Sequence, residues 1–422
     1  MTSASLVSTQ SRVESPFIIV TVGDYTFGHC AFKENKQKLK SVLKVQFPNY
    51  IQGIDIVKVN GAINTYSIKM IYGITQNDDP NMLERVFSSV QKSRKIVLSY
   101  GDWNTPGYIY KDEEAMINKI QSSIDFKNSQ ILYTITCTST SLALKAGSHS
   151  FSSRRDKPSN VLFELLSNER YGLKSVFRGM THKDKLSSFI ATDDKVVNIQ
   201  AKPSMNVLDY ISYLVSCMVS QSDPETNGKK KSNYYWCVYD DTNNAYGGAY
   251  FRVMKVSSQT AYSNLINAYE VDIGYPSSNY VTAFSLKNDE TWSILYDYAD
   301  KVEQPNYTYH INDEGFIEST YSPNITKSST YFTTTESSKT WWTQMTQYPI
   351  SASLTIKGLL RPSILMSYVK VNTYFFGHKH ISSGLYIITK QQDKIDSSGY
   401  STTLTLSRIG GEIIQNTLTG GA

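Results

Sequence analysis

Apolar and polar residues alternate along most of this chain, and this alternation predicts a fold built mainly from β-strands. Strand-length runs with a period of two are separated by short Gly, Asn, Asp and Ser segments, which are typical of turns. The clearest hairpin joins two such runs through Asn60-Gly61, a sequence that favours a type I′ turn. The segments expected as strands are 17–22, 25–32, 41–47, 51–58, 62–72, 95–100, 129–143, 234–240, 249–256, 280–286, 350–356, 365–372, 384–390 and 400–409.

Apolar residues at helical spacing occupy a smaller part of the chain. Asp79 is a good N-cap and Pro80 suits the first helical position, so a helix is expected from there to Val90. The apolar residues of 113–125 recur every third or fourth position, which predicts a second amphipathic helix. Other expectations are a helix at 161–166, a helix at 204–219 capped by Ser204 or Asn206, and a charged loop at 34–40.

Length, composition and charge limit the classes of protein to consider. The 422 residues fit two or three domains, with a boundary in the polar, basic segment 147–158. The 31 Tyr and 16 Phe, with many Ser and Thr, suit pleated sheets and protein interfaces. The net charge of +5 gives no general case for nucleic-acid binding. No secretory signal and no membrane span are expected.

Residues that could carry chemistry are scattered along the chain. No motif pairs a nucleophile with a base, and no phosphate-binding glycine loop is present. The cysteines lack the spacing of a disulfide framework or a zinc site, so reduced thiols are expected at Cys30, Cys137, Cys217 and Cys237. No catalytic, cofactor-binding or metal-binding residue is therefore predicted, and no cofactor.

Some residue pairs leave alternatives open. His378 and His380 could share a metal if both lay on one strand face, but no third ligand is close in sequence, so a surface turn is favoured. Trp341-Trp342 could stack on a sugar, although core or subunit packing is favoured. Weaker candidates are acid pairs for glycoside hydrolysis at Asp240-Asp241 and Asp289-Glu290, and a phosphate contact at Lys229–Lys231.

Three segments carry a resemblance to a known family. Gly384-Leu385-Tyr386-Ile387-Ile388, Ile395-Asp396-Ser397-Ser398-Gly399-Tyr400 and Thr402 to Arg408 together resemble the last hairpin of central baseplate hub proteins of contractile phage tails. The spike carrier of type VI secretion shares that fold family. Residues 50–100, with Asp78-Asp79-Pro80 opening a helix, are similar to the first barrel of these hubs, and 205–218 is similar to their connector.

The resemblance implies an α+β, mainly β fold with two tail-tube-like antiparallel β-barrels, a helical connector and an additional β-rich insert. The implied division is a flexible N-terminal arm at 1–15, a first barrel at 16–146, the connector at 147–222, the insert at 223–345, which can be interleaved with the second barrel, second-barrel strands at 346–412 and a C-terminal tail at 413–422.

The resemblance also implies a non-enzymatic virion protein of the tail baseplate, assembled in the host cytoplasm. Its partners would be two further copies of itself in a homotrimer, the tail tube protein, the central spike, the tape measure protein, and baseplate wedge or sheath-side proteins. The genome would pass through the ring without sequence-specific binding. Alternatives are a distal tail or tube terminator protein of the same superfamily, or a carbohydrate-binding β protein that uses Trp341 or Trp342.

Overall fold

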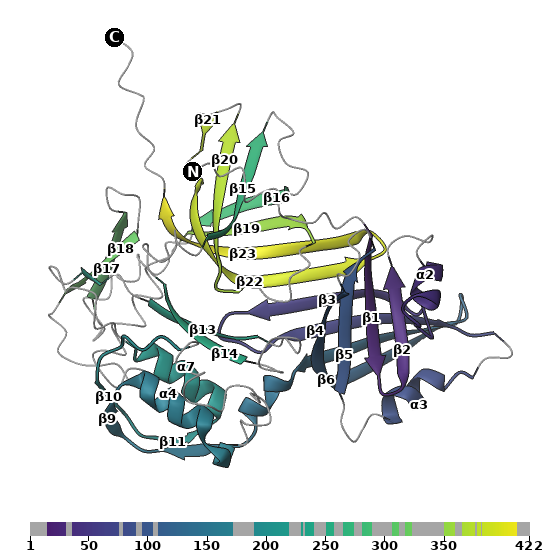
Figure 1. Cartoon of the computed structure of the whole chain (residues 1–422), viewed down its shortest axis with the longest axis horizontal. Coiled ribbons are helices and arrows are strands. Elements are labelled where there is room, and N and C mark those ends of the chain that lie inside the picture. The colour runs from purple at the N-terminus through teal and green to yellow at the C-terminus, as the bar shows by residue number, and fades with distance from the viewer. Residues whose placement is uncertain are drawn as a thin grey trace, which may run out of the picture.

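In the computed structural model, one large sheet dominates the arrangement of strands and helices (Figure 1). The structure describes residues 15–30, 36–75, 79–89, 95–103, 109–171, 190–218, 229–230, 233–239, 250–256, 265–273, 281–288, 306–311, 317–322, 350–358, 365–375, 378–380 and 382–411. The expectation of a mainly β, antiparallel fold with a smaller helical part is confirmed.

The first lobe is a curved antiparallel sheet in the order β3-β4-β7-β6-β5-β1-β2. Alternate Val, Ile and Tyr side chains point into its core, and the apolar face of helix α3 (Met82–Ser89) covers part of that core through Leu83, Val86 and Phe87. Its strands are β1 (Pro16–Val22), β2 (Tyr25–Cys30), β3 (Ile51–Val59), β4 (Thr65–Gly73), β5 (Lys95–Asp102), β6 (Ile109–Asp125) and β7 (Gln130–Ser139).

The second lobe is formed by later strands around a separate apolar core. Strand β20 pairs with β15 in parallel, and β16 pairs with β19 in antiparallel fashion. Its strands are β15 (Leu265–Ile273), β16 (Val281–Asn288), β19 (Ile350–Lys357), β20 (Tyr368–Phe375) and the short β21 (His378–Lys379).

One long hairpin belongs to both lobes. It consists of β22 (Gly384–Asp396) and β23 (Gly399–Gly411), and it lies between β3 and β19 (Figure 1). The first half of β22 pairs with β20, and the second half pairs with β3. Ile395 and Tyr400 therefore enter the first core, whereas Leu385 and Leu406 enter the second. The result is one 14-stranded sheet that serves two cores.

A helical part with its own core follows the first lobe in the chain. Helix α4 (Pro158–Ser167) packs with α7 (Val207–Ser216), and the Asn206 side chain caps α7 by accepting from the Asp209 N–H at 2.8 Å. Short segments around these helices are the 3₁₀ turns Thr140–Lys145 and Glu169–Tyr171 and the strands β8 (His149–Phe151), β9 (Arg154–Asp156), β10 (Val197–Ile199) and β11 (Lys202–Met205).

The remaining described elements come from the region between the helical part and β19. Trp236 and Val253, from the paired strands β13 and β14, enter the core of the helical part. A separate small sheet has the order β12-β18-β17. The bounds are β13 (Asn233–Tyr239), β14 (Tyr250–Val256), β12 (Lys229–Lys230), β17 (Asn306–Ile311) and β18 (Ile317–Ser322). No helix in the described part of the chain is long and apolar enough to cross a membrane.

Most predicted strands are confirmed within a few residues, but the helix predicted at 113–125 is wrong. That segment lies in β6, which pairs with β5 and then with β7. Its apolar residues fit helical spacing by coincidence, because Glu113, Ala115 and Ile117 are the buried positions and they alternate. Hydrogen-bonding partners in β5 and then in β7 decide in favour of a strand, and the periodicity of the segment alone does not reveal these partners.

Three further local predictions are wrong. The loop at 34–40 and the strand at 41–47 are replaced by helix α2 (Lys36–Ser41) and an irregular segment that ends with a bridge from Phe47 to Phe27. The predicted strand 129–143 ends at Ser139 and continues as a 3₁₀ turn.

The prediction of a type I′ turn at Asn60-Gly61 is also wrong. Residues 60–64 separate β3 from β4, and of the pair only Gly61 has a positive φ, of 67°. Neighbouring strands use the backbone donors of this loop, because Asn60 N–H donates to the Thr389 carbonyl at 2.8 Å and Gly61 N–H donates to the Trp236 carbonyl at 2.9 Å. Tertiary contacts therefore determine the loop conformation.

Candidate functional site

A network of buried polar side chains lies inside the first lobe. Glu113 of β6 is fully buried, and its carboxylate accepts from Lys58 Nζ at 2.6 Å, Tyr66 OH at 3.0 Å and Tyr100 OH at 2.7 Å. Lys58 is equally buried, so the two charges are paired away from water. Burial, followed by the charge of Glu113, raises the pKa of Tyr100 well above its ordinary value, so that phenol remains a hydrogen-bond donor.

The shared hairpin contributes a second carboxyl group to this interior. Asp393 accepts from Thr402 Oγ1 at 2.6 Å and Tyr400 OH at 3.1 Å through one oxygen, and from Gln391 Nε2 at 2.6 Å through the other. Burial raises the pKa of Asp393 to about 6, while the hydrogen bonds and the charge of Lys58 act in the opposite direction. A carboxyl group with this pKa changes its protonation state just below neutral pH.

These polar residues require one particular register between the hairpin and the first lobe. In the observed pairing Gln391 lies opposite Lys58, and Asp393 lies opposite Ile56. A slip by one residue would turn Gln391 and Asp393 to the outer face and leave polar groups inside without partners. We infer that the network specifies how the shared hairpin docks on the first lobe.

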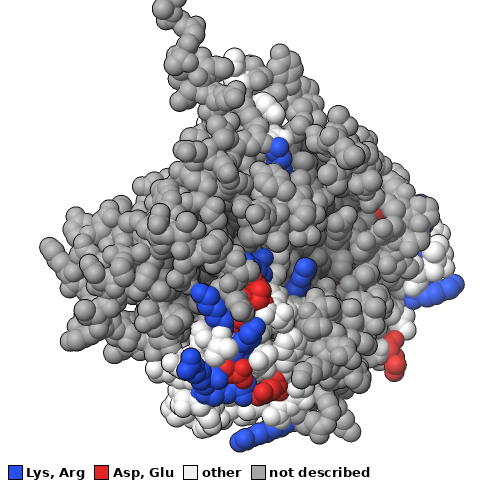
Figure 2. Space-filling model, turned by 60° about the vertical axis from the view of Figure 1, so that its left-hand side comes forward, with Lys and Arg blue, Asp and Glu red and all other residues white. Residues whose placement is uncertain are grey.

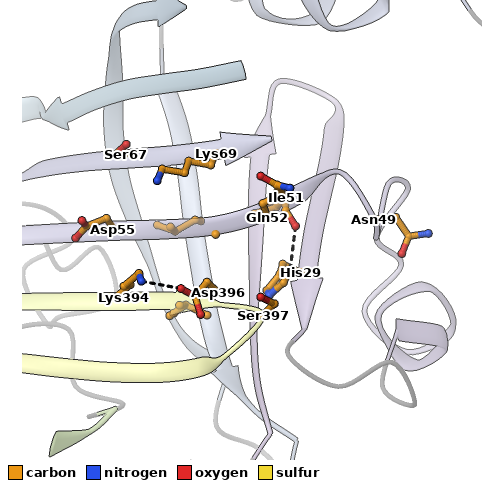
Figure 3. Close-up of a pocket in the computed structure, with 13 residues that line it drawn as sticks. His29, Asn49, Ile51, Gln52, Asp55, Ser67, Lys69, Lys394, Asp396 and Ser397 are labelled. Carbon is orange, nitrogen blue, oxygen red and sulfur yellow. Dashed lines mark hydrogen bonds and ion pairs between the residues drawn. The ribbon is translucent and has the colours of Figure 1, made fainter. Parts of the chain in front are cut away.

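A recess with a volume of about 470 Å³, lined by both polar and apolar residues, lies on the outer face of the same junction (Figure 3). Cross-strand neighbours form two rows there, Lys394–Asp55–Ser67 and Asp396–Gly53–Lys69. Gly53 has no side chain, so the second row is hollow at its centre. A Cβ atom at Gly53 would come within 3.0 Å of Asp396 Cβ, which shows how closely β22 passes.

Charges in the recess are mixed. Lys394 Nζ lies 2.9 Å from Asp396, and Gln392 Nε2 donates to both oxygens of Asp55 at 3.0 and 3.1 Å. Hydrogen bonds from Ser398 and the ion pair with Lys394 outweigh partial burial and lower the pKa of Asp396 to about 2. The recess therefore presents fixed charges of both signs, suited to a polar surface of a partner.

His29 closes one end of the recess and also joins β2 to β3. Its Nδ1 lies 2.9 Å from the Ile51 carbonyl oxygen, and because a carbonyl can only accept, Nδ1 carries the hydrogen. Nε2 is buried and has no partner within the described residues. His29 therefore links β2 to β3 through its hydrogen bond to Ile51. In the described part of the chain, no hydroxyl or thiol is hydrogen-bonded to its imidazole.

Sheet edges without a further strand among the described residues are the third feature of interest. The edge of β2 is covered by the Gln46-Phe47 segment, whose Phe47 N–H and carbonyl bond the backbone of Thr26 and Gly28. In contrast, Ile120 and Ile124 of β6 are 42% and 60% exposed, and Leu286 of β16 is 39% exposed. Edges with exposed apolar residues favour pairing with another chain.

The charged surface of the helical part does not present a single sign. On the face shown in Figure 2, Lys and Arg lie among Asp and Glu over the described residues. Arg154 pairs with Glu164 at 2.5 Å and with Asp156 at 3.3 Å, and Lys255 pairs with Asp193 at 3.0 Å. This part of the surface therefore lacks the concentrated basic field that phosphate backbones require.

The candidates named from sequence do not meet in one site. His378 is exposed in β21, and His380 follows the strand and contacts Ser382 Oγ at 2.8 Å through Nδ1. No group of three metal-ligating side chains occurs among the described residues. Cys30, Cys137 and Cys217 are buried free thiols. Trp341, Trp342, Asp240, Asp241, Asp289, Glu290 and Lys231 lie outside the described residues, and Lys229-Lys230 forms β12.

Sequence reasoning missed the buried network, although a signal was present. Lys58 occupies the same alternating face as Ile54 and Ile56, and Asp393 occupies the same face as Ile395. A charged residue at an apolar position of a strand indicates either an error in the strand or a buried partner. That the partner is Glu113 could not be known before strand order was known.

No model of a known protein family matches the chain, and no curated protein matches it by sequence. Among solved structures, the chain is similar to the 43 kDa tail protein of prophage MuSo2 from Shewanella oneidensis, at 11% identity, with 93% of this chain and 98% of that chain covered and a TM-score of 0.48. A tail protein from Neisseria meningitidis MC58 shows 8% identity, coverage of 93% and 96%, and a TM-score of 0.48.

A third similar structure is the E. coli c3393 protein, a component of the type VI secretion system with structural similarity to the T4 tail proteins gp27 and gp5. Its identity is 7%, the coverage is 87% of this chain and 75% of that chain, and the TM-score is 0.45. These neighbours are tail proteins and a type VI secretion component. Because all three TM-scores are below 0.5, functional conclusions must rest on this chain's own residues.

Proposed function

We propose that this chain is a non-enzymatic structural protein of a phage tail, and specifically the central hub of the baseplate. In this role three copies form a ring that joins the tail tube to the central spike and lets the genome pass. The proposed partners are the tube, spike and tape measure proteins and the wedge or sheath-side proteins of the baseplate. The proposed location is the virion tail, after assembly in the host cytoplasm.

The shared hairpin is the observation that carries this proposal. The segments that resemble hub proteins, from Gly384 to Arg408, form β22 and β23 and connect two β lobes within one sheet. A chain with two lobes on a common sheet can supply six lobes to a ring from three copies. The apolar edges at β6 and β16 are favourable only if another chain covers them. We retain the division into barrels at 16–146 and 346–412 as part of the proposal.

The first experiment is a mass measurement on the full chain. Size-exclusion chromatography with light scattering over a wide concentration range should give three copies or a multiple of three. Electron micrographs of end views should then show a ring with an open centre and three-fold symmetry. A protein that stays monomeric at all concentrations, alone and with its tube and spike partners, would contradict the hub role. A closed ring with six-fold symmetry would support the distal tail or tube terminator alternative.

A further inference from the structure

The second half of β6 is a regular strand with one open side. Its neighbour on that side, β5, pairs only as far as Met116, and no described strand continues beyond that point. The register with β7 shifts at Asn118 and is regular from Lys119 to Asp125. Such a bulge turns the strand away from its former neighbour. Residues 119–125, which we call the β6 edge, therefore present free backbone groups in the described structure.

Two apolar side chains of the β6 edge continue a buried row. Ile120 lies opposite Ile135 of β7, and Ile124 lies opposite Ile131. The β7 residues are buried, whereas Ile120 and Ile124 are exposed, and no described strand lies on the open side of their strand. Cross-strand partners share one face of a sheet, so the row ends abruptly at the β6 edge. One more strand with apolar residues at matching positions would complete it.

The sequence of the β6 edge is complementary to itself. It reads Lys119-Ile120-Gln121-Ser122-Ser123-Ile124-Asp125, with opposite charges at its ends and isoleucines at equal distances from Ser122. In an antiparallel pair of two such strands centred on Ser122, each Ile120 faces Ile124 of the second copy. Each Lys119 likewise faces Asp125 of the second copy, on the other face of the sheet.

We propose that the β6 edge pairs with the β6 edge of a second copy of this chain across a two-fold axis at Ser122. The pairing extends each apolar row to four isoleucines, one on each of four neighbouring strands. Their order is Ile135 of β7 and Ile120 of β6 from one copy, then Ile124 of β6 and Ile131 of β7 from the second copy. It also satisfies the free backbone groups and places unlike charges together. This contact is isologous, so it joins copies in pairs and is separate from the closure of a three-membered ring.

Two other edges of the large sheet, at β2 and β16, fit this occupant less well. The β2 edge is already covered by Gln46-Phe47. The β16 edge carries exposed Leu286 beside Lys287 but no acidic residue. Antiparallel pairing of this edge with a second β16 edge, or with a β6 edge, would therefore not place opposite charges together at both ends of the pair. A β6 edge is therefore the partner segment that the sequence pattern favours.

A cysteine placed on the axis tests the register directly. With Ser122→Cys, the two residues at position 122 lie opposite one another at about 4.5–5.5 Å between Cα atoms, within the range of a disulfide. Mild oxidation of the full chain should give a covalent dimer on a non-reducing gel. Ser123→Cys is the matched control, because positions 123 of two copies are diagonal, about 7–8 Å apart or more. Equal cross-linking of both variants, or of neither, overturns the proposed register.

A second test separates this contact from the ring. Ile124→Glu places a charge at the exposed edge, and Val42→Glu is its control, at a residue directly after α2 that is 62% exposed and lies outside the β6 edge. If both contacts form, the wild-type assembly contains six copies. Ile124→Glu then halves its mass to that of three copies, whereas Val42→Glu leaves the mass unchanged. A wild-type dimer that becomes a monomer supports the β6 contact and contradicts the ring. A trimer or hexamer whose mass Ile124→Glu leaves unchanged overturns the β6 contact alone. A wild type that is monomeric at all concentrations overturns the β6 contact, and it contradicts the ring as well if it stays monomeric with the tube and spike partners.

Discussion

The two lobes share a hairpin but hold it by different means. In the first lobe, β22 and β23 contribute Gln391, Asp393 and Thr402 to a buried network that includes the ion pair of Lys58 and Glu113. In the second lobe, the same strands contribute Leu385 and other aliphatic residues to an apolar core. Hydrogen bonds and charges are directional, whereas apolar packing depends mainly on volume. The first lobe therefore specifies the register of the shared hairpin, and the second lobe stabilises the hairpin mainly by burying its apolar side chains.

The largest expected effect comes from breaking the ion pair of the first lobe. Glu113→Ala removes the acceptor of Lys58, Tyr66 and Tyr100 and leaves a buried ammonium group, which should lower the free energy of unfolding by about 3–5 kcal/mol. Urea denaturation followed by circular dichroism measures this loss. Glu114→Ala is the control, because its ion pair with Lys95 is partly exposed and should contribute less than about 1 kcal/mol. Similar losses for both variants would contradict the role assigned to Glu113.

A smaller loss is expected where the second lobe touches the first. Gly358, directly after β19, lies against the ring of Tyr400, and its N–H donates to the Tyr400 carbonyl at 2.8 Å. A Cβ atom at position 358 would overlap that ring, so Gly358→Ala should destabilise the chain by about 1–3 kcal/mol through overpacking. Gly73→Ala is the control, since a Cβ there meets no atom within 4 Å. Thermal unfolding of the two variants compares them, and a neutral Gly358→Ala would show that the lobes do not pack tightly at Tyr400.

The smallest expected effect is a pH dependence of the free energy of unfolding, which arises from Asp393 in the first lobe. Burial raises the pKa of Asp393 in the folded chain to about 6, above the pKa of the same group in the unfolded chain. The contribution of Asp393 to stability is therefore fully present below the unfolded-state pKa, and it is lost as the pH rises through about 6. Relative to Asp393→Asn, the wild type should therefore gain about 1 kcal/mol of stability when the pH falls from about 7.5 to about 5. Urea denaturation at both pH values gives the difference between the two proteins.

Asp396 provides the control for this measurement. Hydrogen bonds and Lys394 lower its pKa to about 2, so Asp396 stays ionised over the same interval. The difference between the wild type and Asp396→Asn should be constant between these pH values. A constant difference for Asp393→Asn as well would contradict the raised pKa of that buried carboxyl group.

Local patterns in the sequence were sufficient where a segment depends mainly on itself. Asp79-Pro80 correctly indicated a nearby helix, although α3 begins two residues later than predicted, at Met82. Asn206 correctly indicated a cap, because this signal acts within one helical turn. The hairpin of β22 and β23 was predicted from alternation and from Ser397-Ser398-Gly399, where Gly399 has a φ of 122°. Even there β22 is longer than predicted, since its second half pairs with β3.

The tertiary structure decided everything that depends on which strands are neighbours. Residues 113–125 were predicted to be a helix because periodicity reports only the side-chain pattern of one segment, while β5 and β7 supply the hydrogen bonds that make it a strand. Lys58, Glu113 and Asp393 are distant in sequence and meet because β3, β6 and β22 line one interior. The amino-acid sequence by itself determined the β-rich class, the main helices and the C-terminal hairpin. Strand order determined the buried network and the open edges, because hydrogen bonds between strands form between residues whose separation in sequence is arbitrary.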